Sequence, residues 1–220
     1  MADSIATAAD YADAIMTARR AKNTLFLLLL LILLAQLALF FLGRNDVLNF
    51  TGGAGATVEV PATTQPTTTA SAIDPVWIAK LEYLVNLTAY LGIVLTIVLA
   101  VVLLLIVKIM LVGRLIGVAR LTSAFIWTVV LAALLFPWQA FWPDNFDFKL
   151  PGALYTWDEL VHRVKFRGEL ADSTVLFWAR FVGFPVLALI ILLSIQVRSR
   201  RGLQQALGEA HYDSTNAPLT

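Results

Sequence analysis

The chain has 220 residues, of which 59% are hydrophobic and only 14% are charged, and its formal net charge is +1. With a mean hydropathy of +0.79, this composition excludes an ordinary soluble surface and indicates a membrane protein. The lack of cysteine excludes disulfides, thiolate metal sites and cysteine nucleophiles, and no basic patch interleaved with aromatic residues indicates nucleic-acid binding.

Four apolar stretches are long enough to cross a hydrocarbon core, which is about 30 Å thick and needs roughly 20 residues of helix. They cover residues 24–42, 84–107, 121–137 and 175–197. Because backbone groups in lipid must bond within their own segment, each stretch is expected to be helical. The predicted fold is an all-α integral membrane protein with four transmembrane helices in a bundle.

The chain begins with an alanine-rich segment, residues 1–23, that places its apolar side chains on one helical face. We expect a short amphipathic helix on the cytoplasmic side. The following span, 24–42, is predicted to be a retained signal anchor, because its apolar run is longer than that of a signal peptide and no small-residue cleavage site follows closely. Gln36 is the polar side chain in its middle, and it is a candidate for a contact between helices.

Residues 43–73 are rich in Thr, Gly, Ala and Pro, which predicts a flexible linker outside the cytoplasm. Order is expected to return with a helix over 74–107, since Asp74 can cap it and Pro75 suits its first position. Trp77 is expected to anchor this helix at the membrane interface. Glu82, at the outer end of the second span, is a candidate for a polar contact with another helix.

The link between the second and third spans, residues 108–120, is a predicted basic cytoplasmic turn. Lys108, Arg114 and Arg120 are its basic residues and are expected to contact anionic lipid headgroups. On the predicted topology, nine basic residues lie on this side and seven on the other. The excess favours cytoplasmic termini by the positive-inside rule, and the predicted location is the plasma membrane, with a bacterial inner membrane as the first choice.

The third span is followed by an aromatic loop, residues 138–174, outside the cytoplasm. Trp138 and Trp142 are expected to belong to an aromatic belt at the interface; a docking surface or a pocket for a lipid or quinone is the alternative. Further along, Thr156 and Glu159 have the spacing of a capping box. They predict a short interfacial helix over 157–167, with Trp157 on its apolar face as another anchor.

The fourth span, 175–197, contains Arg180 and Pro185 in the sequence LFWARFVGFP. Arg180 lies close enough to the outer end for its side chain to reach the interface, which favours a role as a membrane anchor. The alternatives are an ion pair with Glu82 and a role in transport or ligand binding. Pro185 is expected to kink the helix beside Gly183, and residues 198–220 form a predicted polar cytoplasmic tail.

The spans carry few reactive side chains, and the chain contains none of the common hydrolase, nucleotide-binding or zinc-protease motifs. The sequence therefore predicts a protein that is not an enzyme and binds no cofactor or metal. The function class that remains is an accessory, scaffold or assembly subunit of a larger membrane complex. Its expected partners are membrane lipids and other membrane proteins or further copies of the chain; a small-solute transporter or an oligomeric channel component is the alternative.

Overall fold

The computed structural model describes residues 8–45, 75–136, 152–163, 175 and 177–208. The described chain consists of helices and their connections, in the order α1 (Ala8–Arg44), α2 (Pro75–Val112), α3 (Val118–Leu135), α4 (Trp157–Arg163), the π-helix η3 (Ala179–Gly183) and α6 (Phe184–Ala206). Most of the predicted linker 43–73 and of the tail 198–220 lies outside the described residues, and so do Trp138, Trp142 and the predicted helical residues 164–167.

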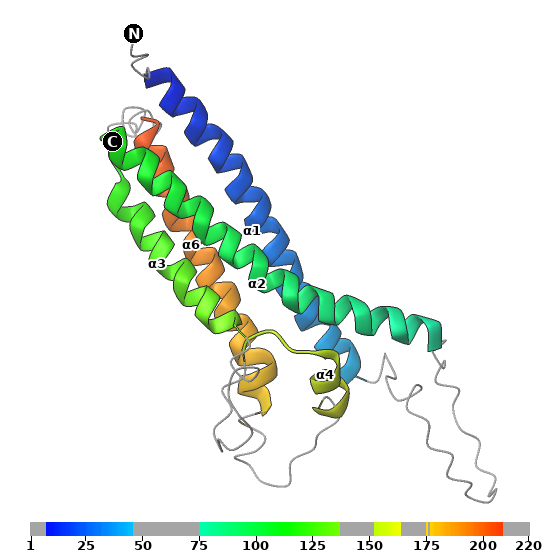
Figure 1. Cartoon of the computed structure of the whole chain (residues 1–220). Helices are drawn as coiled ribbons and strands as arrows, with labels where there is room; N and C mark the ends of the chain where they lie inside the picture. The colour runs from blue at the N-terminus through cyan, green and yellow to red at the C-terminus, as the bar shows by residue number, and fades with distance from the viewer. Residues whose placement is uncertain (1–7, 46–74, 137–151, 164–174, 176, 209–220) are drawn as a thin grey trace, which may run out of the picture.

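Four helices are long and apolar enough to cross a membrane, as the composition predicts. These stretches are Asp13–Arg44, Ala79–Val112, Val118–Leu135 and Ala179–Ala206. The long helices lie side by side (Figure 1), with α1 contacting α2 and α6, and α3 contacting the same two helices. The described chain begins and ends at the same end of this bundle.

The first helix is one continuous element rather than a short amphipathic helix followed by a span. α1 runs from Ala8 to Arg44 without a break, because the alanine-rich start and the leucine-rich span both favour helix and contain neither Gly nor Pro before Gly43. Ile15 from the predicted amphipathic segment is buried in the main core, whereas Met16 beside it is exposed. Ile15 therefore packs against the bundle, whereas Met16 does not.

The turn between α2 and α3 is shorter than the predicted 108–120, because α2 continues to Val112 and α3 begins at Val118. Small residues let α6 approach this turn closely: a Cβ added to Gly117 would lie 2.6 Å from the carbonyl oxygen of Gly202. Gly117 also has a φ angle of 100°, which L-residues with a side chain rarely adopt. Lys108, Arg114 and Arg120 are all exposed around this turn.

The bundle has two hydrophobic clusters. The larger one follows the four long helices and includes Leu33, Leu103, Leu131 and Leu192. The smaller one lies where α4 and η3 meet α1 and α2, and it is rich in aromatic rings; we call it the aromatic cluster. Its buried members are Phe40, Val85, Tyr155, Trp157, Leu160, Phe177 and Phe181.

Candidate functional site

A stretch of non-helical backbone, residues 152–156, enters the bundle just before α4; we call it the inserted segment. Residues 152–155 are buried, and the backbone N–H of Ala153 donates to the carbonyl oxygen of Leu134, at 2.8 Å, in the last turn of α3. Gly152 touches the end of the same helix so closely that an added Cβ would lie 2.6 Å from the carbonyl oxygen of Phe136. The inserted segment therefore continues the bundle beyond the point where α3 ends.

The inserted segment reaches far along α1 and α2. The side chain of Leu154 covers Gly92 of α2, where an added Cβ would lie 2.8 Å from the Leu154 Cδ1 atom. The hydroxyl of Tyr155 donates a hydrogen bond to the carbonyl oxygen of Gln36 on α1. At 1.5 Å per residue, Gln36 lies about 12 Å before the end of α1 at Arg44, so the inserted segment lies well inside the bundle.

Arg180 holds this segment in place. Its Nη1 donates to the carbonyl oxygen of Gly152, and its Nη2 donates to that of Leu154 at 3.4 Å. A non-helical segment has backbone carbonyls without partners of its own, and buried carbonyls without partners are costly. The guanidinium supplies donors to two of them at once, which its forked geometry allows.

The charge of Arg180 is balanced by Glu159 from α4. Arg180 Nε donates to Glu159 Oε1 at 2.9 Å, and Nη2 donates to Oε2 at 2.8 Å. The two side chains are only 8% and 15% exposed, so this is a bidentate and largely buried ion pair. It joins the inserted segment, α4 and η3 into one unit.

This geometry corrects the expected role of Arg180. An anchor that reaches the membrane surface must be exposed at its tip, whereas Arg180 is buried at 7% exposure. Its acidic partner is Glu159 rather than Glu82, which is exposed on α2. From the sequence, Glu159 could be identified only as a capping-box residue. Its carboxylate bonds to Arg180 because of the way the inserted segment folds.

The π-helix explains how Arg180 and its neighbour Phe181 are both buried. Pro185 has no N–H and cannot bond to the carbonyl of Phe181, and just before it the N–H of Phe184 bonds to the carbonyl of Ala179, five residues back. The expected disturbance near Gly183 therefore takes the form of a wider turn. It turns consecutive side chains inward, and Phe181 stacks on Phe40 with ring centroids 5.1 Å apart.

Trp157 is part of this unit, not a membrane anchor. It is only 7% exposed and belongs to the aromatic cluster. Its backbone N–H donates to Asn86 Oδ1 of α2 at 3.1 Å, which fixes the start of α4 against α2. Trp77, by contrast, is 59% exposed, with Lys80 Nζ 4.7 Å from the centre of its ring.

Gln36 is buried at 1% exposure, as a contact between helices requires. Neither its amide nitrogen nor its amide oxygen has a hydrogen-bond partner among the described residues. The other buried polar side chains of the described spans do have partners: Thr96 and Thr128 bond to carbonyls of their own helices, and Lys22 bonds to α6. Gln36 is therefore the exception within the described bundle.

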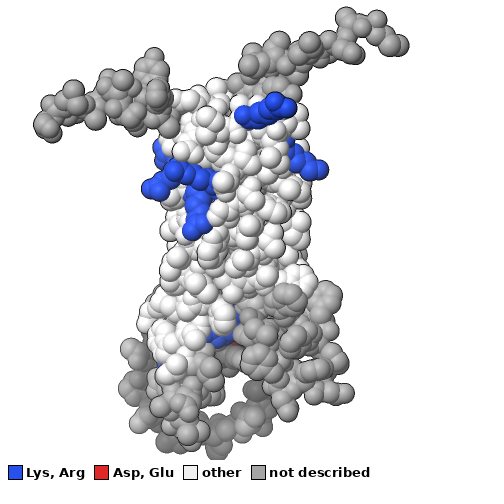
Figure 2. All heavy atoms as spheres, turned by 90° about the vertical axis from the view of Figure 1, so that its left-hand side faces the viewer, with Lys and Arg blue, Asp and Glu red and all other residues white. Residues whose placement is uncertain are grey.

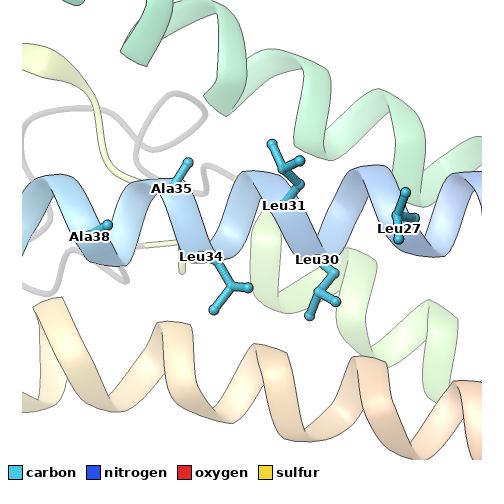
Figure 3. A pocket seen from close by; sticks show the side chains of 6 residues that line it. All are labelled: Leu27, Leu30, Leu31, Leu34, Ala35 and Ala38. Carbon is cyan, nitrogen blue, oxygen red and sulfur yellow. The ribbon is translucent and has the colours of Figure 1, made fainter.

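An open groove along α1 has a purely aliphatic lining (Figure 3). Its volume is about 470 Å³, and the side chains that line it are Leu27, Leu30, Leu31, Leu34, Ala35 and Ala38. Leu27 and Leu31 are each 60% exposed, so the groove belongs to the outer surface of the bundle. None of these side chains can donate or accept a hydrogen bond, so the groove suits lipid chains rather than a polar solute.

The arrangement as a whole holds the fold together. In the described residues, no group of three or more His, Asp or Glu side chains could hold a metal ion. Four of the five N–H donors of Arg180 are engaged by protein oxygens, which leaves little capacity for a ligand. Comparison of the chain with protein-family models, curated proteins and solved structures finds no match.

Proposed function

We propose that this chain is a non-catalytic, multi-pass membrane protein that acts as an accessory, scaffold or assembly subunit of a larger membrane complex. The observation that carries the proposal is that the buried charged side chains bond within the protein. Arg180, Glu159 and Lys22 bond to other groups of the same chain, as groups that hold a fold together do. A transport path would instead keep polar groups available at mid-membrane.

The spacing of two contacts between α1 and the fourth span, which comprises η3 and α6, supports a membrane-spanning position. At one end, Lys22 of α1 bonds to Ser199 of α6 at 2.8 Å. At the other end, the Arg44 guanidinium lies 5.4 Å from the centre of the Phe177 ring. Along either segment, from Lys22 to Arg44 or from Phe177 to Ser199, these levels are about 33 Å apart at 1.5 Å per residue, close to the thickness of a hydrocarbon core, about 30 Å.

In such a position the inserted segment lies at the depth of the hydrocarbon core. Non-helical backbone is tolerated at that depth only where protein buries it and satisfies its polar groups. The Arg180 and Tyr155 hydrogen bonds meet this need. The unit of inserted segment, α4 and η3 is then a rigid cap on one end of the bundle, suited to presenting a fixed surface to a partner.

The outer face of α2 is the surface that we assign to a partner helix. Large exposed side chains recur along it at alternating steps of four and three residues, the spacing of helices that pack side by side. They are Tyr83, Leu87, Tyr90, Val94, Ile97, Val101 and Leu104. Two tyrosines in this stripe add the amphipathic rings that are enriched in protein interfaces.

Cross-linking tests the proposal, since the native chain has no cysteine. Tyr90→Cys and Ile97→Cys lie on the stripe, and Val129→Cys on the exposed face of α3 is the matched control. After treatment of native membranes with a thiol-to-amine photo-cross-linker, we expect the stripe variants to yield one discrete adduct that the control lacks. Adducts of equal yield at all three positions, or none at any, contradict a subunit role for this face.

We also propose an orientation in which both termini lie in the cytoplasm of a bacterial cell. It is supported by the basic residues at the end where α1 begins and α6 ends, which Figure 2 shows as blue side chains. Gln65→Cys and Asn145→Cys should react with an impermeant thiol reagent added outside intact cells, whereas Ile116→Cys should react only after lysis. The reverse pattern contradicts this orientation.

One observation favours the alternative, a small-solute transporter or a channel component. Gln36 keeps an unsatisfied amide in the middle of the bundle, as a solute-binding group would. A transport role predicts that Gln36→Leu abolishes activity while leaving the fold intact. The structural role predicts a folded variant with unchanged retention of partners.

A further inference from the structure

Lys22 is a buried cation at the end of the bundle where α1 begins. The residue is 2% exposed, and its Nζ donates to Gln196 Oε1 at 3.0 Å and to Ser199 Oγ at 2.8 Å, both on α6. Gln196 Nε2 donates in turn to Asn23 Oδ1 at 3.2 Å. An ammonium has three N–H donors, and these contacts use two of them.

The charge of Lys22 is not balanced within the described part of the chain. Both of its acceptors are neutral, and the charged groups that act on it are other cations, Arg19 and Arg200. Asp13, the acidic residue of α1 whose side chain the structure describes, is exposed and lies about 13 Å away along the helix at 1.5 Å per residue. A buried charge without a counter-charge is costly, and an anion that reaches Lys22 would lower this cost.

The surroundings of Lys22 indicate which anion this is. Arg198, at the same level of α6, bonds to Ser123 of α3, and its guanidinium lies 5.5 Å from the centre of the Trp127 ring. Basic and Trp side chains gather in this way at the level of lipid headgroups. Among the described residues, Figure 2 shows several basic side chains and no acidic one at this end of the visible face.

We propose that Lys22, oriented by Gln196 and Ser199, binds a phosphate group at the boundary of the bundle, and that an anionic lipid supplies this phosphate from its headgroup. A phosphate oxygen provides the third acceptor for the ammonium and a negative charge that the described part of the site lacks. Because the site joins α1 to α6, the bound lipid also ties the first and last spans together. This site is separate from the exposed bases of the turn, Lys108, Arg114 and Arg120.

Native mass spectrometry and thermal unfolding test this proposal on the full chain in detergent. The variants are Lys22→Gln, which removes the charge, Lys22→Arg, which keeps it, and Lys80→Gln, which removes an exposed base near the start of α2. We expect the parent to bind phosphatidylglycerol at least about fivefold more tightly than Lys22→Gln does, the effect of about 1 kcal/mol for one base beside an anionic lipid. Lys22→Arg and Lys80→Gln should lie within about threefold of the parent, since one keeps the charge and the other removes an exposed base at the end of α2 that is farther from Lys22.

Two further measurements use only the parent protein, so they do not depend on whether a variant folds. The first distinguishes a lipid headgroup from free phosphate as the ligand. Inorganic phosphate should leave the unfolding temperature of the parent unchanged at concentrations where phosphatidylglycerol raises it; the converse result overturns the lipid assignment. In the parent itself, phosphatidylglycerol should survive collisional activation better than phosphatidylcholine. Equal retention of the two lipids, or equal binding of phosphatidylglycerol by the parent and Lys22→Gln, overturns the proposal.

Discussion

The ion pair between Arg180 and Glu159 is expected to be a principal source of stability for the inserted segment. Arg180→Met removes the guanidinium and keeps a side chain of similar length. It leaves the Glu159 carboxylate, only 15% exposed, without its cation and removes a donor from the carbonyls of Gly152 and Leu154. Breaking one side of a buried pair costs about 3–5 kcal/mol, so we expect a loss of stability in this range.

Two further variants separate charge from geometry. Arg180→Lys keeps the charge but cannot reach both carboxylate oxygens and two carbonyls at once; losing one or two charged hydrogen bonds should cost about 2–4 kcal/mol. Glu159→Leu alone should also destabilise the protein, because the guanidinium then stays buried without a counter-charge. The double variant Arg180→Met with Glu159→Leu should lose less than the sum of the two, with a coupling of about 1–3 kcal/mol.

The assay is unfolding in mixed micelles with increasing sodium dodecyl sulfate, followed by tryptophan fluorescence. Glu82→Gln is the matched control: an exposed carboxylate on α2 whose loss should change the free energy of unfolding by less than about 0.5 kcal/mol. An Arg180→Lys protein as stable as the parent, together with additive effects in the double variant, would refute this reasoning. That outcome would restore the role of a membrane anchor.

Three other changes give outcomes of known sign in the same unfolding assay. Gln36→Leu should stabilise the protein by about 1–2 kcal/mol, because it removes two buried amide atoms without partners; a loss of stability would show that the amide has a partner in the membrane. Gly152→Ala should destabilise by about 1–3 kcal/mol, since its Cβ would lie 2.6 Å from a carbonyl oxygen. Gly183→Ala, whose Cβ would find no atom closer than 3.8 Å, is its control, and equal effects of the two would contradict the close contact. Tyr155→Phe should cost about 1 kcal/mol through the lost bond to the Gln36 carbonyl, and an unchanged stability would argue against that bond.

The four helices that are long and apolar enough to cross a membrane could be predicted from the sequence, because length and hydropathy decide them locally. Pro185 likewise indicated a disturbed turn beside Gly183. The site could not be predicted, because each of its contacts joins residues far apart in the chain. Nothing near Glu159 in the sequence indicates that α4 folds back on η3, and nothing near Lys22 indicates that Ser199 will face it.

The dependence on contacts between distant residues also explains why the sequence predicted different roles for Arg180 and Trp157. Arg180 and Trp157 look like interfacial residues when each is considered within its own segment, since one lies near a span end and the other opens an amphipathic helix. Arg180 is buried against the inserted segment, and Trp157 follows that segment into the aromatic cluster. Sequence periodicity reports the polarity of one helix face, and it does not report which segment covers that face.

Thiol accessibility at Ala153 tests most directly whether Arg180 holds the inserted segment inside the bundle. Ala153 is 0% exposed, and Ala153→Cys adds one sulfur atom to a chain that has no other cysteine. We predict that this thiol reacts slowly with a small maleimide in the folded parent and rapidly once Arg180→Met is added, while Ile116→Cys, exposed at the other end, reacts rapidly in both. Rapid labelling of Ala153→Cys in the parent, or slow labelling that Arg180→Met leaves unchanged, would contradict the account.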